Sequence, residues 1–178
     1  MMLDEHYMQR AVAEAQKGIG LTSPNPPVGA MIVRGDKVIG RGWHRKVGGA
    51  HAEREAIKNA GEGVDLTGTT IYVTLEPCST CGRTGACTDA IIEAGFSRVV
   101  YGSRDVNPDH IGAADEILKL AGIEVVSGIL EEECEELIRG FSKRMLMGLP
   151  WVIAKSAMSL DGRITRPEGE GQWLTGAE

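Results

Sequence analysis

From residue 69 onward, segments with strand composition alternate with segments of helical composition, and this alternation constrains the fold more strongly than any other feature. Strands are expected at residues 69–75, 98–102 and 124–126, and helices at residues 86–94, 113–121 and 131–147. Strands that alternate with helices in this way are normally joined by crossovers between parallel neighbours. The second half of the chain is therefore predicted to form the parallel part of an α/β fold.

The first half adds an antiparallel hairpin to this arrangement. A helix is expected over residues 4–17, where apolar side chains recur at helical spacing, and another over residues 51–60, which stops at Gly61. Between them, residues 28–33 and 38–43 flank a short polar turn and predict two antiparallel strands. The expected architecture is a three-layer α/β/α sandwich whose mixed sheet has about five strands.

A domain boundary is predicted near residue 148. A Gly-Leu-Pro sequence at 148–150 follows the last expected helix, and a new apolar strand is expected at residues 151–154. The residues that follow are too few for a domain, since domains usually have about 50–250 residues. The chain is therefore divided into one domain at residues 1–147 and the first strand and loop of another at residues 148–178.

The composition of the chain excludes several classes of protein. There are 19 Lys and Arg residues against 25 Asp and Glu, and the net charge of −6 counts against a nucleic-acid partner, which normally requires a basic surface. The N-terminus lacks the pattern of a signal peptide, and no run reaches the ~18 apolar residues of a membrane span. With 4 Cys, of which three lie within residues 78–87, a disulfide scaffold is excluded and a cytoplasmic protein is expected.

Two short motifs carry the chemistry that the sequence predicts. The first is His51-x-Glu53 at the start of a helix, and the second is a Pro-Cys segment that contains Cys78, Cys81 and Cys87. One His and two Cys form a three-ligand set for Zn²⁺ that leaves a position open for water, whereas a structural zinc site would need four protein ligands. Glu53 is placed to take a proton from that water and pass it to a leaving amine. Since H-x-E followed by P-C-x-x-C is the signature of zinc-dependent base deaminases, the motifs predict such an enzyme.

Further motifs indicate a more specific relationship. Residues 4–147 resemble the deaminase domain of the bifunctional riboflavin-biosynthesis deaminase–reductases, which belong to the cytidine-deaminase-like superfamily. The resemblance rests on the zinc motifs and on segments 24–29, 75–87, 105–108 and 140–145. Residues 155–163 and 172–175 resemble the opening of the family's reductase domain. Reductase activity is not expected of this chain, and a separate or missing reductase domain is left open.

The resemblance implies a particular reaction and a set of substrate contacts. The reaction is hydrolysis of 2,5-diamino-6-ribosylamino-4(3H)-pyrimidinone 5′-phosphate to 5-amino-6-ribosylaminouracil 5′-phosphate and ammonia, with zinc as the cofactor. The implied substrate contacts are Asn25, His44, Arg83 and Asp105, and Thr80 stands where many relatives have another contact. The planar guanidinium of Arg83 suits a phosphate group. A homo-oligomer with this small pyrimidine ribosyl phosphate as its substrate is expected.

The second cysteine ligand is a choice between two residues. The general spacing P-C-x-x-C selects Cys81, whereas the family resemblance selects Cys87. Cys87 is followed by apolar residues at i+3 and i+4, which would bury a helix that begins at Cys87 and give its thiolate the helix dipole. We therefore favour His51, Cys78 and Cys87 as ligands, with Cys81 as the alternative.

Two other functions are alternatives to this one. Another nucleoside, nucleotide or tRNA-adenosine deaminase would share the zinc motifs, although the net charge of −6 counts against a tRNA enzyme. An inactive zinc-stabilised binding module would lack the proton shuttle, and yet Glu53 is present. Activity on the pyrimidinone phosphate and on cytidine separates the three functions.

Overall fold

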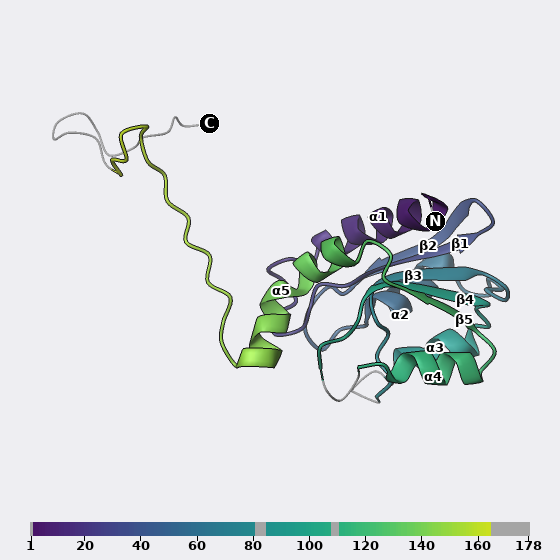
Figure 1. The fold of residues 1–178 in the computed structure, drawn as a ribbon. Coiled ribbons are helices and arrows are strands. Elements are labelled where there is room, and N and C mark those ends of the chain that lie inside the picture. The colour runs from purple at the N-terminus through teal and green to yellow at the C-terminus, as the bar shows by residue number, and fades with distance from the viewer. Residues whose placement is uncertain (1, 81–84, 108–110, 165–178) are drawn as a thin grey trace.

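The computed structural model describes residues 2–80, 85–107 and 111–164, in which a sheet lies between two layers of helices (Figure 1). The helices are α1 (Met2–Gln16), α2 (Ala52–Ala60), α3 (Cys87–Glu93), α4 (Ala113–Leu120) and α5 (Glu131–Met147). The strands are β1 (Gly29–Arg34), β2 (Lys37–Trp43), β3 (Thr70–Leu75), β4 (Arg98–Ser103) and β5 (Glu124–Ser127). Every helix and strand predicted before residue 148 is present, with ends that differ by at most two residues. Within the described part of the chain, no helix has the length and apolarity needed to cross a membrane.

The sheet is mixed and its strand order is β2-β1-β3-β4-β5. Strand β1 is antiparallel to both β2 and β3, whereas β3, β4 and β5 are parallel to one another. Helices α1 and α5 cover one face of the sheet, and α2, α3 and α4 cover the other (Figure 1). The predicted α/β/α sandwich with a five-stranded mixed sheet is confirmed.

The side chains of β1 alternate between the two helical layers. Ala30 and Ile32 join the core on the side of α2, α3 and α4, whereas Met31 and Val33 join the core on the side of α1 and α5. All four side chains are buried. Because helices cover both faces, the central strands are mostly apolar and do not alternate between apolar and polar residues.

Two glycines allow helices to approach the sheet closely. A Cβ atom on Gly29 would lie 2.1 Å from the carbonyl oxygen of Ala11 in α1, and one on Gly42 would lie 2.3 Å from the backbone nitrogen of Ala56 in α2. Neither distance leaves room for a side chain, so both positions require glycine. The close approach of α2 is important for the site, because this helix carries Glu53 in its first turn.

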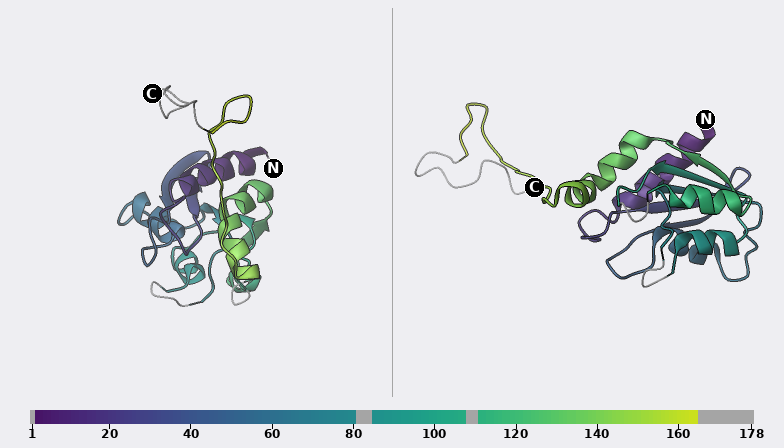
Figure 2. Two further views of the ribbon diagram at one scale, coloured as in Figure 1. Left: turned by 90° about the vertical axis from the view of Figure 1, so that its left-hand side faces the viewer. Right: turned by 60° about the horizontal axis from the view of Figure 1, so that its bottom comes forward.

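The strand predicted at residues 151–154 is not formed. Residues 150–159 have neither helix nor strand, and the chain leaves the sandwich after α5 (Figure 2). An apolar run forms a strand only where a neighbouring strand pairs with its backbone, and none of the five strands in the described residues does so. Trp151 packs against α5 instead, where the guanidinium carbon of Arg139 lies 4.7 Å from the centre of its ring.

Candidate metal centre and its cavity

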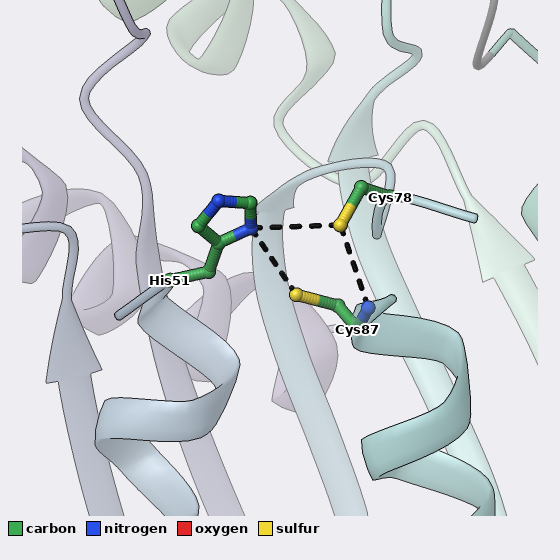
Figure 3. A group of neighbouring side chains, drawn as sticks. All are labelled: His51, Cys78 and Cys87. Carbon is green, nitrogen blue, oxygen red and sulfur yellow. Dashed lines mark hydrogen bonds between the residues drawn. The ribbon is translucent and has the colours of Figure 1, made fainter. Parts of the chain in front are cut away.

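An imidazole and two thiols from different elements meet at one point of the molecule (Figure 3). His51 is the N-cap residue of α2, Cys78 lies in the loop after β3, and Cys87 is the first residue of α3. The Nδ1 atom of His51 lies 3.5 Å from the Sγ atom of Cys78 and 3.3 Å from that of Cys87. The three potential ligand atoms lie within 4.8 Å of one another, so a single metal ion can contact all of them.

The spacing of these atoms fits a tetrahedral zinc ion. With a Zn–S distance of about 2.3 Å and a Zn–N distance of about 2.0–2.1 Å, a sulfur and a nitrogen ligand are separated by about 3.6 Å at the tetrahedral angle. The observed separations of 3.5 and 3.3 Å are close to this value. Three protein ligands also suit a catalytic zinc ion, which keeps one position for water or substrate.

The backbone between β3 and α3 holds the two cysteines together. The N–H groups of Cys87 and Thr88 donate to the carbonyl oxygen of Cys78 at 3.0 and 3.2 Å. The N–H of Cys87 also lies 3.4 Å from the Sγ atom of Cys78, which accepts from it. Because the N–H groups at a helix start carry partial positive charge, the first turn of α3 stabilises a thiolate at Cys78.

The pKa values of the two thiols are shifted in opposite directions. The pKa of Cys78 is lowered, first because the Cys87 thiol donates a hydrogen bond to its sulfur and further because of His51. The pKa of Cys87 is raised by the same contact with Cys78 and by burial. Two thiolates this close are unfavourable without a cation, and a bound metal dication removes the penalty by coordinating both sulfurs.

Glu53 is a buried carboxyl group beside the three ligands. Its side chain is 3% exposed and lies in the first turn of α2, two residues after His51. Burial raises the pKa of Glu53, and the negative charge of Cys78 raises it further. A carboxyl group whose pKa is shifted toward neutrality exchanges its proton readily with bound molecules. Glu53 can therefore carry a proton between groups at the metal centre.

A cavity of about 270 Å³ opens beside the metal centre. Its described lining residues come from both ends of the β1–β2 hairpin, the start of α2, the loops after β3 and β4, and α5: Asn25, Pro26, Val28, His44, His51, Ala52, Glu53, Leu75, Glu76, Cys78, Asp105, Asn107 and Phe141. Its size and its mixture of apolar walls and a few polar groups are typical of a small-molecule site. A larger groove of about 650 Å³ between α1 and α5 contains none of the three ligands.

Three of the predicted substrate contacts lie on the wall of this cavity. Asn25 and His44 contact each other, with 3.1 Å between the Asn25 Nδ2 and His44 Nε2 atoms. Asp105 follows β4 and is 6% exposed. Thr80 is exposed and is not among the described residues that line the cavity. The fifth predicted contact, Arg83, lies outside the described residues.

The alternative ligand Cys81 also lies outside the described residues. The distance between Cys81 and His51 is therefore not described. The choice of Cys87 over Cys81 stays a prediction, supported by the distance of 3.3 Å between Cys87 Sγ and His51 Nδ1.

Three polar or aromatic residues of the cavity wall were not predicted as site residues: Glu76, Asn107 and Phe141. Glu76 is 3% exposed, its Oε2 atom accepts from the N–H of Asp105 at 3.3 Å, and its Oε1 atom has no partner among the described residues. The N–H of Asn107 donates to Asp105 Oδ1 at 2.9 Å. Glu76 and Asn107 follow parallel strands, where ligand sites commonly form, and that signal could have identified them. Phe141 reaches the cavity only because of how α5 packs.

Comparison with known proteins agrees with this geometry. Residues 1–103 match the family model of the cytidine and deoxycytidylate deaminase zinc-binding region, and residues 150–178 match that of the RibD C-terminal domain. The riboflavin biosynthesis protein RibD of Escherichia coli is 47% identical over 174 residues, which are 98% of this chain and 47% of that protein.

Solved structures of related proteins also resemble the structure of this chain. A diaminohydroxyphosphoribosylaminopyrimidine deaminase/5-amino-6-(5-phosphoribosylamino)uracil reductase from Thermotoga maritima superposes with a TM-score of 0.92 at 45% identity, covering 98% of this chain and 50% of that one. RibD from Acinetobacter baumannii gives a TM-score of 0.86 at 46% identity, covering 98% of this chain and 49% of that one.

These likenesses confirm the resemblance that the sequence motifs predicted. The chain spans about half the length of the curated relatives it matches. The matched region is zinc-binding, and the cluster of His51, Cys78 and Cys87 can hold the ion, so the prediction of zinc as the cofactor is confirmed as well. The chain belongs to the family of deaminases that share the cytidine and deoxycytidylate deaminase zinc-binding region.

Proposed function

We propose that this chain is the deaminase part of a riboflavin-biosynthesis enzyme. In this proposal it hydrolyses 2,5-diamino-6-ribosylamino-4(3H)-pyrimidinone 5′-phosphate, replacing the 2-amino group by oxygen and releasing ammonia. The observation that carries the proposal is the meeting of His51, Cys78 and Cys87 with the buried carboxyl of Glu53 at one cavity. The choice of substrate is supported by the relatives, which are named RibD or carry this deaminase in their description.

The residues of the metal centre have distinct roles in this reaction. His51, Cys78 and Cys87 hold zinc, with Cys81 as the alternative to Cys87. Bound zinc is a Lewis acid that brings the pKa of a water molecule toward neutrality. Glu53 takes a proton from the attacking water and delivers it to the amino group, which then leaves as ammonia. Burial of Glu53 keeps this proton away from bulk water.

The remaining polar residues are proposed to bind the substrate. Asn25 and Asp105 line the cavity and offer hydrogen bonds to the heterocycle and its ribosyl group. His44 also lines the cavity, and its Nε2 atom lies 3.1 Å from the amide nitrogen of Asn25. Arg83 is proposed as the phosphate ligand, because a guanidinium binds oxyanions through paired hydrogen bonds. Thr80 is proposed to act at the same end of the substrate.

The rest of the chain fits a bifunctional arrangement. We propose residues 1–147 as the deaminase domain and residues 148–178 as the opening of a reductase domain, supported by the match of residues 150–178 to the RibD C-terminal domain.

A reducing compartment, the cytoplasm, is proposed because metal-binding thiolates must stay unoxidised. A homo-oligomer and a separate reductase partner stay predictions.

Substrate selection tests the proposal. Zinc-loaded protein is assayed for ammonia release from the pyrimidinone phosphate, from its dephosphorylated form and from deoxycytidine 5′-phosphate. We expect the first to be preferred over the second by about 10- to 100-fold in kcat/KM, the effect of one charge-assisted phosphate contact. A preference for deoxycytidine 5′-phosphate would favour another deaminase of the family, and no ammonia from any compound would favour a binding module.

A further inference from the structure

The backbone of Asn25 is held in place by the loop before β1. Its N–H donates to the carbonyl oxygen of Thr22 at 2.9 Å, and the Thr22 hydroxyl donates to the Asn25 carbonyl oxygen at 3.0 Å. Thr22 is 2% exposed, so these hydrogen bonds of its hydroxyl and carbonyl groups are shielded from water. What remains to be fixed is the side-chain amide, whose oxygen and nitrogen exchange places when the group turns over.

The tautomer of His44 decides which way this amide turns. The carbonyl oxygen of Ala50 can only accept a hydrogen bond, so the His44 Nδ1 atom, 2.9 Å away, carries the proton. In the neutral ring the other nitrogen, Nε2, is then an acceptor, and it lies 3.1 Å from the Asn25 Nδ2 atom. Because the amide nitrogen is itself a donor, this contact requires an unprotonated Nε2 atom, which the neutral ring provides.

Both nitrogens of the His44 ring are therefore already used within the protein. The ring is 3% exposed, and its hydrogen bonds lead to Ala50 on one side and Asn25 on the other. One N–H of the Asn25 amide is directed to His44, so the amide oxygen is turned away from the ring and is the acceptor that this side chain can offer to a molecule in the cavity.

We infer that His44 is a positioning residue, which turns the amide of Asn25 so that the cavity presents an acceptor to a hydrogen-bond donor of the substrate. The inference rests on the proposed function and replaces a direct contact between His44 and substrate with an indirect one. The donor is an N–H group of the heterocycle or a ribose hydroxyl, and the pyrimidinone phosphate carries both. A ligand that presents a carbonyl or an unprotonated ring nitrogen at this place meets an acceptor and binds weakly.

A double-mutant cycle tests the inference. Dissociation constants of the pyrimidinone phosphate are measured in a zinc-loaded Glu53→Gln background, which suppresses turnover, without a further change and with His44→Leu, Asn25→Ala or both. We expect each single change to weaken binding by about 10- to 100-fold, as for a lost hydrogen bond in a buried site. If His44 acts through Asn25, the double variant binds no more weakly than Asn25→Ala alone. Effects that multiply would mean that His44 contacts the substrate itself, which would overturn the inference.

Two controls separate positioning from a general structural role. His44→Gln provides an oxygen that can accept from the Asn25 amide, so it should recover most of the binding lost in His44→Leu. Thermal midpoint and zinc content should be the same in the wild type and in all variants that are compared. No recovery in His44→Gln, with fold and zinc intact, would contradict the positioning role.

A spectroscopic measurement on the wild-type protein tests the inference without any substitution. In the ¹⁵N spectrum of the wild-type imidazoles, we expect His44 to carry its proton on Nδ1 and none on Nε2. A proton on Nε2 would reverse the direction of the hydrogen bond with Asn25 and overturn the inference.

Repeating the binding cycle with the free heterocycle identifies the substrate group that donates to Asn25. If the loss of binding in the variants persists, the donor is an N–H group of the heterocycle, and if it disappears, the donor is a ribose hydroxyl.

Failure of the proposed function and failure of this inference give different results. A wild-type protein that binds the pyrimidinone phosphate without releasing ammonia would contradict the proposed reaction, while the cycle would still decide the role of His44. A wild-type protein that does not bind the compound would contradict both.

Discussion

Replacing Gly42 with Ala should damage the metal centre without altering any ligand. A Cβ atom at this position of β2 would lie 2.3 Å from the backbone nitrogen of Ala56 and 2.5 Å from the carbonyl oxygen of Ala52, both in α2. Ordinary contacts begin at 3.4 Å, so the helix must move away from the sheet by about 1 Å. His51 caps α2 and would move with it, whereas both cysteines lie on other elements.

A movement of this size exceeds what a zinc site tolerates, since its ligand distances are normally kept within about 0.2 Å. We expect zinc affinity to fall by about 10- to 100-fold, the loss seen when the support of a metal ligand is disturbed. Turnover should fall by about 100-fold, because a misplacement of about 1 Å at a reacting centre has that effect. Overpacking should also lower the free energy of unfolding by about 1–3 kcal/mol.

The assay is competition for zinc against a coloured chelator, with urea unfolding and ammonia release measured on the same samples. Gly140→Ala in α5 is a matched control, because a Cβ atom there would meet the Trp151 side chain at an ordinary 3.5 Å. We expect wild-type zinc affinity in this control. Wild-type zinc affinity in Gly42→Ala would refute the argument that close packing of α2 positions His51.

Three further predictions test the proton shuttle, the choice of cysteine ligand and the stability of the fold. Glu53→Gln should keep zinc and fold but lose about 10²–10⁴-fold in turnover, because an amide cannot accept the proton, and a rate above a tenth of wild type would count against the shuttle. Cys87→Ser should abolish zinc binding while Cys81→Ser retains it, and the opposite result in metal analysis would reassign the ligand. Asp4→Asn should lower the free energy of unfolding by about 1.5–3 kcal/mol at neutral pH, because Asp4 accepts from two guanidinium nitrogens of Arg98 at 2.7 and 3.2 Å. Since Arg98 holds the pKa of Asp4 below its usual 3.8, this stabilisation is complete above pH 3.8 and is lost as the pH falls through the lower value of the folded state. Urea unfolding should therefore show the two proteins converging in acid, and a difference that stays constant there would contradict the assignment.

The helices and strands could be predicted because each is encoded within its own segment. Helix α2 stops where Gly61 adopts a φ of 110°, and Gly122, with a φ of 80°, follows α4. Glycine adopts such angles without strain, so its position in the sequence marks the end of a helix. The zinc motifs could be recognised for a similar reason, since His51-x-Glu53 lies within one turn of a helix.

The features that escaped prediction depend on contacts between distant segments. The pairing of Asn25 with His44 exists only after the hairpin brings the two ends of β1 and β2 together, and no local pattern shows that His44 is also held by Ala50. Phe141 belongs to a helix with several apolar residues, and the packing of α5 decides that this one reaches the cavity. The apolar run at residues 151–154 has strand composition, but composition does not supply the neighbouring strand.

Zinc-dependent ammonia release from 2,5-diamino-6-ribosylamino-4(3H)-pyrimidinone 5′-phosphate tests the central claim most directly. The purified chain is assayed as loaded with zinc, after removal of the metal by a chelator, and again after zinc is restored. The site formed by His51, Cys78, Cys87 and Glu53 predicts ammonia release that stops on removal of zinc and returns with it. Ammonia release that is unchanged in the zinc-free protein, or none from the fully loaded protein, would contradict the account.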